Sequence, residues 1–268
     1  MTATAPSSSA FANQCWTYER ATPGGIVIGV DGSRESIAAL NTAAAIARRR
    51  RCCLHAVTVI APFPAYRLNG LDYSHEAREQ LRVALKDSEL SAILRMVEPP
   101  ANWTHDVVIG NPAEVLAEVA ESRCADLLVI GLRDHGFVDR ALGDETSIQV
   151  MRTSVVPVLA TDHYVGAPRV IVVATDFTAA SNRAACAAVE LLGSSGTLYL
   201  VHVDPTPNTI ATADEMRAAD AVSFRFRRLI YTLRVGGRLT VEPVVLTGQT
   251  VKVINDFAAR VGADMIAA

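Results

Sequence analysis

The chain has 268 residues, which is enough for one large domain or two of ordinary size, and half of them are hydrophobic, ample for buried cores. Its formal net charge of -3 provides no global basic field, so we expect neither nucleic acid nor an anionic membrane as a partner. No apolar run approaches the roughly 18–20 residues that span a bilayer, so we expect no transmembrane helix.

The cysteines and the N-terminal segment bear on the cellular setting. The five cysteines include no C-x-x-C pair, so their spacing predicts neither a disulfide framework nor a zinc ribbon. A reducing, cytoplasmic location fits this pattern best. Residues 1–23 are rich in Ala, Ser and Thr but have neither a basic start nor an apolar h-region. We therefore expect a disordered tail there, not a signal peptide.

The first half of the chain alternates short apolar segments with segments of helical length. These predict strands at residues 25–30, 53–60, 103–109, 127–130 and 155–160, and helices at residues 35–50, 74–96, 113–122 and 144–152. Near-continuously apolar strands separated by helices are typical of a parallel sheet covered by helices. In such sheets, ligands bind beyond the carboxyl ends of the strands, where a loop leads into a helix N-terminus. The loop after Ile130 is therefore the first place to look for a functional site.

The same pattern starts again after residues 161–169, which are predicted to form a linker. A second short strand ends at Asp176, as the first strand ends at Asp31, and each is followed by an Ala-rich helix. Residues 110–126 recur without a gap as residues 248–264. These correspondences indicate an internal duplication of a β-α-β-α-β-α-β unit.

The second copy is predicted to be incomplete, because Ile130 corresponds to Ala268, the last residue. It lacks the counterpart of the functional loop, the fourth helix and the fifth strand. We therefore expect an α/β fold with two tandem open parallel-sheet units, a first domain at 24–162 and an incomplete second domain at 168–268. The fourth strand of the second copy, Asp264–Ala268, should form a sheet edge that another part of the chain or a second subunit covers.

A long helix is predicted in the second copy at about residues 211–233, and it contains three arginines. Arg225, Arg227 and Arg228 are expected to form its solvated face, with contact to a partner as the alternative.

Four segments in this order carry a resemblance to a known family. They are GVDGS at residues 29–33, GNPAEVLAEVAESRCADLLVIG at 110–131, SVVPVLA at 154–160 and TDFTAAS at 175–181. With them, the span from Gly25 to Ala268 resembles the universal stress protein (UspA) family in tandem form. The resemblance implies a Rossmann-like, adenine-nucleotide α-hydrolase-like sheet of strand order 3-2-1-4-5. It also implies homodimers or tandem pseudo-dimers joined along the fifth strands, so Val155–Ala160 is the expected dimer seam.

Family members that bind ATP carry a glycine, two residues, a second glycine, nine residues, and then Gly-Ser or Gly-Thr after the fourth strand. Here the first glycine is Gly131, whereas the other three positions fall on Asp134, Asp144 and Glu145. A carboxylate near 4 Å from a phosphate charge costs on the order of 4 kcal/mol at an effective dielectric of 20. We therefore predict a degenerate phosphate site, in which Asp144 and Glu145 cap the following helix.

The resemblance implies further candidate cofactor-binding residues besides Gly131, which are Asp31 and Val59 near the adenine and ribose and Gly136 in the loop. The alternatives are that Asp31 caps the following turn and helix and that Val59 is a core residue. We expect no bound cofactor and no metal site, with ATP as the alternative. A divalent cation that bridged the acidic side chains to a nucleotide would rescue ATP binding.

Three functions are compatible with these residues. The favoured one is a non-catalytic stress-response module that has lost ATP binding and acts through dimerisation or contacts with another protein. The second is a nucleotide-binding regulator that uses Asp31 and Gly131, with weak ATPase activity. The third is an enzyme of the wider α-hydrolase-like group, but residues 29–33 lack the Ser-Gly-Gly-x-Asp-Ser loop of its pyrophosphatases. The sequence also shows no nucleophile, base and orienting residue at motif distance.

Overall fold

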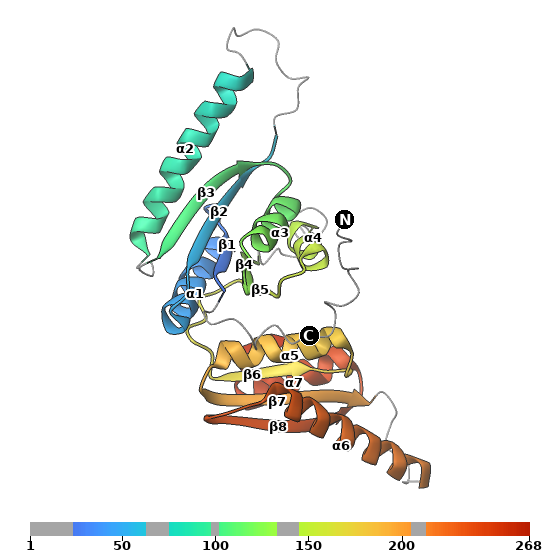
Figure 1. The fold of residues 1–268 in the computed structure, drawn as a ribbon. Helices are drawn as coiled ribbons and strands as arrows, with labels where there is room; N and C mark the ends of the chain where they lie inside the picture. Colours follow the sequence, from blue (N-terminus) through green and yellow to red (C-terminus); the bar gives the residue numbers. More distant parts are fainter. Residues whose placement is uncertain (1–23, 63–74, 98–101, 133–144, 205–212) are drawn as a thin grey trace, which may run out of the picture. The chain divides into compact units, whose positions relative to one another are not determined.

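The structure is a computed structural model that describes residues 24–62, 75–97, 102–132, 145–204 and 213–268 (Figure 1). The described residues divide into two compact units, 24–167 and 168–268. Each unit is an open parallel sheet with helices packed against it, which confirms the predicted fold class.

The first unit has a five-stranded sheet with the strand order β3-β2-β1-β4-β5, in which all neighbouring strands are parallel. This is the order that the family resemblance implied. The elements are β1 (Ile26–Gly29), α1 (Arg34–Arg50), β2 (Leu54–Ile60), α2 (His75–Met96), β3 (Trp103–Ile109), α3 (Pro112–Ser122), β4 (Leu127–Gly131), α4 (Glu145–Thr153) and β5 (Val158–Thr161).

The core of the first unit follows from the apolar strands. The central strands β1, β2 and β4 are buried along most of their length, whereas β3, at the sheet edge, alternates between half-buried and exposed residues. Figure 1 shows α3 and α4 on one side of the sheet and α2 on the other. On the α3 and α4 side, Val27, Val57 and Leu128 pack with Leu116 and Val150 in one buried cluster.

The second unit has a four-stranded parallel sheet with the order β8-β7-β6-β9. Its elements are β6 (Val170–Ala174), α5 (Ala179–Leu192), β7 (Ser195–Asp204), α6 (Ala213–Leu233), β8 (Arg238–Thr247), α7 (Thr250–Val261) and β9 (Met265–Ala267). The strand β9 pairs with β6 and lies at the edge of this sheet, which confirms the predicted edge strand. Ile266 in β9 is 48% exposed within the chain, so what covers this edge stays a prediction.

The fifth strand of the first unit is shorter than predicted. It begins at Val158 and not at Val155, because the Ser154 side chain forms a local turn first. The Ser154 hydroxyl donates to the Val156 carbonyl (2.8 Å) and accepts from the Val156 N–H (3.1 Å). Pro157 follows this turn, and regular pairing with β4 starts at the next residue, Val158.

The cysteines differ partly from the expectation. Cys52 and Cys53 are free thiols, but Cys186 is disulfide-bonded, which the cysteine spacing does not predict. The cytoplasmic location therefore stays a prediction. None of the helices in the described part of the chain has the length and apolar content that a membrane span requires.

Candidate functional site

The turn that joins β1 to α1 holds the first predicted site residue. The Asp31 carboxylate accepts a hydrogen bond from the N–H of Ser33 (2.9 Å). The Ser33 hydroxyl in turn accepts from the N–H of Ser36 (3.1 Å) and thereby caps the N-terminus of α1. Gly32 has a φ of 86°, which a glycine adopts without strain. Asp31 therefore has the turn-capping contact that was the alternative to nucleotide binding.

Gly131, at the end of β4, lies against the same helix N-terminus. A Cβ atom at this position would lie 2.6 Å from the backbone nitrogen of Ser36, far inside van der Waals contact. The N–H of Asp31 reaches the Ser36 hydroxyl at 3.4 Å. Asp31 and Gly131, which are far apart in the sequence, therefore both lie next to Ser36.

The remaining predicted site residues divide into a core residue and loop residues. Val59 is partly buried and packs against the hydrophobic cluster under α3 and α4, which agrees with the alternative prediction that it is a core residue. Its contact with adenine stays a prediction. The loop residues Asp134, Gly136 and Asp144 lie outside the described residues. Glu145 begins α4, but its side chain is not among the described parts of the structure. The replacement of the phosphate-binding residues by acidic ones in this loop therefore stays a prediction as well.

The second unit repeats the turn after its first strand. Asp176, the counterpart of Asp31, accepts from the N–H of Thr178 (2.9 Å) and from the hydroxyl of Ser181 (2.8 Å). Hydrogen bonds from the side chain and then the N–H of Thr178, together with that of the Ser181 hydroxyl, lower the pKa of Asp176 to about 2. The same self-capped turn thus forms in both copies.

A second contact is also repeated, with a different residue. The Thr58 hydroxyl donates to the Val30 carbonyl at 2.8 Å in the first unit. The matching residue in the second unit is His202, whose Nδ1 lies 2.8 Å from the Thr175 carbonyl. A carbonyl can only accept, so Nδ1 carries the proton.

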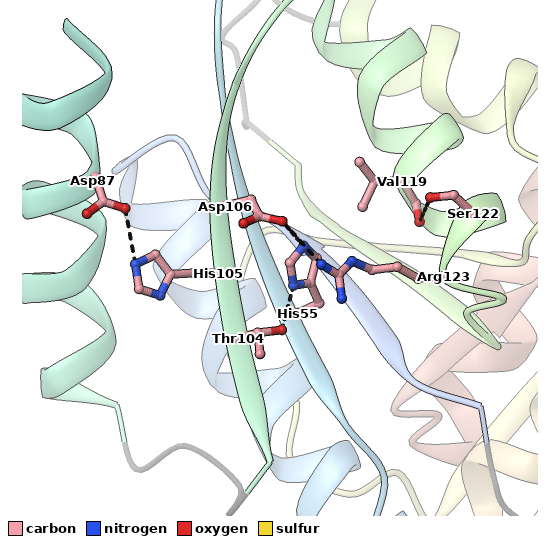
Figure 2. Close-up of polar contacts among 8 residues, drawn as sticks. All are labelled: His55, Asp87, Thr104, His105, Asp106, Val119, Ser122 and Arg123. Carbon is pink, nitrogen blue, oxygen red and sulfur yellow. Dashed lines mark hydrogen bonds and ion pairs between the residues drawn. The ribbon is translucent and has the colours of Figure 1, made fainter. Parts of the chain in front are cut away.

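A polar cluster between β2, β3 and the end of α3 was missed by the sequence analysis (Figure 2). His55 is only 4% exposed, and its Nδ1 lies 2.7 Å from the Thr104 hydroxyl. Its Nε2 lies 3.2 Å from Asp106 Oδ2, and Arg123 contacts the same carboxylate oxygen at 3.2 Å. Strand pairing sets Thr104 opposite His55, so alternating polar residues in β3 were the available signal.

This cluster has the order of a hydroxyl, an imidazole and a carboxylate, but not the geometry of a catalytic triad. Asp106 is 56% exposed and pairs with Arg123, whereas His55 Nε2 has no aligned hydrogen-bond partner among the described residues. The counterparts of His55 and Asp106 in the second unit are Tyr199 and Val244. The fold therefore forms without these charges.

A neighbouring histidine connects β3 to α2 on the other face of the strand. His105 Nε2 lies 3.2 Å from Asp87 Oδ1 and 3.3 Å from the Ser91 hydroxyl, and the Trp103 ring stacks against the imidazole (Figure 2 shows the Asp87 contact). Both α2 residues approach the same ring nitrogen, so these contacts attach α2 to the sheet edge and form no relay.

His55 predicts a specific dependence of stability on pH. Burial, and then the charge of Arg123, lower the pKa of His55 below its ordinary 6.5. As the pH falls through 6.5, the unfolded chain takes up a proton that the folded protein resists, so the free energy of unfolding decreases. We expect this decrease between pH 7 and pH 5 to be steeper in the wild type than in His55→Gln. Urea denaturation across that range measures it, and parallel curves would contradict the prediction.

The comparisons with known proteins identify the family. The model of the universal stress protein family matches residues 24–162 and 168–268. The chain belongs to the universal stress protein family. A universal stress protein structure from Archaeoglobus fulgidus is 20% identical, with a TM-score of 0.62, over 91% of this chain and 84% of that chain. At this identity the similarity shows the fold, and it extends over both units.

Other solved universal stress proteins match about half of the chain. UspA from Lactobacillus plantarum is 22% identical, with a TM-score of 0.43, over 53% of this chain and 99% of that chain. A universal stress protein in complex with cAMP is 27% identical, with a TM-score of 0.37, over 52% of this chain and 97% of that chain. No curated protein matches this sequence.

Within the ranges that the structure describes, no group of three or more His, Cys, Asp or Glu side chains is arranged to hold a metal ion.

Proposed function

We propose that this universal stress protein is a non-catalytic stress-response module that has lost ATP binding in its first unit. It acts through dimerisation or through contacts with another protein. The observation that carries the proposal is the turn at Asp31, where the carboxylate already accepts the Ser33 N–H and Ser33 caps α1. These groups are satisfied within the chain and need no ligand.

The sequence of the loop after β4 supports the same proposal. Asp134, Asp144 and Glu145 stand where ATP-binding members have glycines and a hydroxyl. Each carboxylate that faced a phosphate would oppose binding by on the order of 4 kcal/mol at 4 Å and an effective dielectric of 20. The phosphates of a nucleotide would therefore be repelled at the position where ATP-binding members of the family supply N–H groups.

The second candidate is a nucleotide-binding regulator, and one contact favours it. Asp31 and Gly131, the residues predicted for the adenine and phosphate ends of the site, both lie next to Ser36. In this alternative, a divalent cation would bridge the acidic side chains and the phosphates.

Titration calorimetry of the full chain with ATP, with and without Mg²⁺, tests the loss of nucleotide binding. We expect no binding by the wild type. The triple variant Asp134→Gly, Asp144→Gly, Glu145→Ser restores the glycine and hydroxyl spacing, and we expect its affinity for ATP to be higher by at least about tenfold, since the carboxylate repulsion is removed.

Two further variants separate the candidates. Binding by the wild type that Asp31→Ala abolishes and Asp176→Ala leaves unchanged would establish the nucleotide-binding regulator in place of our proposal. Binding that requires Mg²⁺ would assign the acidic loop to a bridging cation. Asp176→Ala is a matched control because both carboxylates cap the same turn in their own units.

Dimerisation is expected to use the edge strand β5 and the apolar side chains beside it. The strand β5 lies at the edge of its sheet. Val155, just before it, is 60% exposed, and Ile148 and Met151 on α4 are 43% and 46% exposed. Apolar side chains beside an open sheet edge favour pairing with a second copy.

Light scattering after size exclusion tests this seam. We expect the wild type to have twice the mass of one chain and Met151→Glu/Val155→Glu to have the mass of one chain, since like charges would meet across the two-fold axis. Leu85→Glu on α2 alters an equally exposed apolar residue elsewhere and should remain dimeric. A monomeric wild type, or a dimeric double variant, would rule out this seam.

A further inference from the structure

The outer face of α6 carries aromatic side chains where a solvated helix face would carry polar ones. Phe226, Leu229 and Leu233 are buried and define the inner face. Phe224 is 63% exposed and Tyr231 is 85% exposed. At about 100° per residue, the two exposed rings lie seven residues apart on the side of the helix opposite the buried residues.

Two arginines flank this aromatic pair. Arg227 and Arg228 are exposed and lie between Phe224 and Tyr231 on the same outer side. Neither forms an ion pair within the described part of the chain. Arg225 behaves differently, because its guanidinium lies 5.8 Å from the centre of the Phe177 ring within its own unit. The outer face therefore combines two exposed aromatic rings with two positive charges that pair with no carboxylate among the described residues.

The matching helix of the first unit serves as an internal comparison. The outer side of α2 also exposes apolar residues, since Leu81 is 61% and Leu85 is 62% exposed. However, Lys86 on α2 pairs with Glu89 at 2.6 Å. The charge of Lys86 is therefore compensated within its helix. In the part of the chain that the structure describes, Arg227 and Arg228 on α6 have no such acidic partner.

We propose that the outer face of α6, formed by Phe224, Arg227, Arg228 and Tyr231, docks an amphipathic acidic helix of a partner protein. Apolar residues of that helix cover the two rings, and carboxylates on its flanks pair with the two guanidinium groups. Tyrosine and arginine, the residue types most enriched among binding hot spots, are both present on this face.

A protein partner fits this face better than a nucleic acid does. Asp220 is exposed and lies one turn before Phe224 on the same side. There it would repel the regularly spaced phosphates of a nucleic acid, whereas a helix can carry carboxylates beside the two arginines and none beside Asp220. The chain as a whole has a net charge of -3, which gives no long-range attraction for a polyanion. The inference rests on the proposed function, because it gives the protein-contact role a place. Its test involves neither ATP nor β5, so the failure of one proposal is distinguishable from the failure of the other.

The test uses a fluorescein-labelled synthetic amphipathic helical peptide with a leucine seam flanked by glutamates, titrated with the full chain by fluorescence anisotropy. A second peptide has lysine in place of every glutamate. We expect the glutamate peptide to bind at least about tenfold more tightly than the lysine peptide. Phe224→Ala/Tyr231→Ala and Arg227→Ala/Arg228→Ala should each weaken binding by about tenfold or more.

Controls separate docking from general adhesion to apolar surface. Leu81→Ala/Leu85→Ala removes exposed apolar residues of α2 and should leave peptide binding unchanged. Thermal unfolding should show that all the variants fold. No binding of the glutamate peptide, equal binding of the lysine peptide, or unchanged binding by both α6 variants would overturn the proposal. So would tight binding of oligo(dT) that the arginine changes abolish. Loss of the dimer in Phe224→Ala/Tyr231→Ala would assign the face to a second copy instead.

Discussion

Replacing Gly131 with alanine is expected to destabilise the protein by about 2–3 kcal/mol, in the range of overpacked core substitutions. The added Cβ would lie 2.6 Å from the nitrogen and 2.9 Å from the Cα of Ser36, and 2.8 Å from the carbonyl carbon of Glu35. These are backbone atoms in the first turn of α1, so no side chain can rotate away. Either α1 or the end of β4 must shift. Urea denaturation followed by circular dichroism measures the loss.

Gly166→Ala is the matched control for this substitution. A Cβ atom at Gly166 would meet only the Tyr164 hydroxyl, at 3.7 Å, which is ordinary contact. Its effect should stay within about 0.5 kcal/mol, as for most surface substitutions. If Gly131→Ala were equally mild, the close approach of β4 to α1 would be wrong.

Removing the carboxylate of Asp126 is expected to cost about 3 kcal/mol of stability. Arg50 Nη2 lies 2.9 Å from Asp126 Oδ2, and the two side chains are only 13% and 14% exposed. Asp126→Ala withdraws the negative charge and leaves a largely buried guanidinium, which is more costly than the loss of a surface ion pair. The pair joins the end of α1 to the start of β4, so its loss should be seen as a lower denaturation midpoint.

The second unit and a double variant provide the controls for Asp126. Asp264, the counterpart, is exposed and accepts from the N–H groups of Arg169 (2.7 Å) and Val170 (2.9 Å). We expect Asp264→Ala to cost only about 1 kcal/mol, as for an accessible hydrogen-bonding group. Arg50→Ala/Asp126→Ala should cost less than the sum of the single variants, because each single variant already removes the ion pair between the two residues. Strictly additive losses would show that the two residues do not interact.

Local pattern and short-range hydrogen bonds explain what the sequence determined by itself. Continuous apolar strands predicted a parallel sheet, and the repeat of residues 110–126 at 248–264 predicted the second unit. The Asp31 turn could likewise be predicted from the sequence, because Asp31, Ser33 and Ser36 form their hydrogen bonds within six residues. At β5 the same kind of local bond, made by Ser154, was overlooked, so the strand was predicted to start too early.

Only the tertiary structure decided which distant residues meet and which side chains stay exposed. Gly131 reaches Ser36, and His55 meets Asp106 and Arg123, because parallel strand register and crossover helices bring separate segments to one place. A helical periodicity shows that Phe224 and Phe226 lie on different sides of α6, but not which side packs on the sheet. That choice depends on the total apolar area that each side can bury against its neighbours.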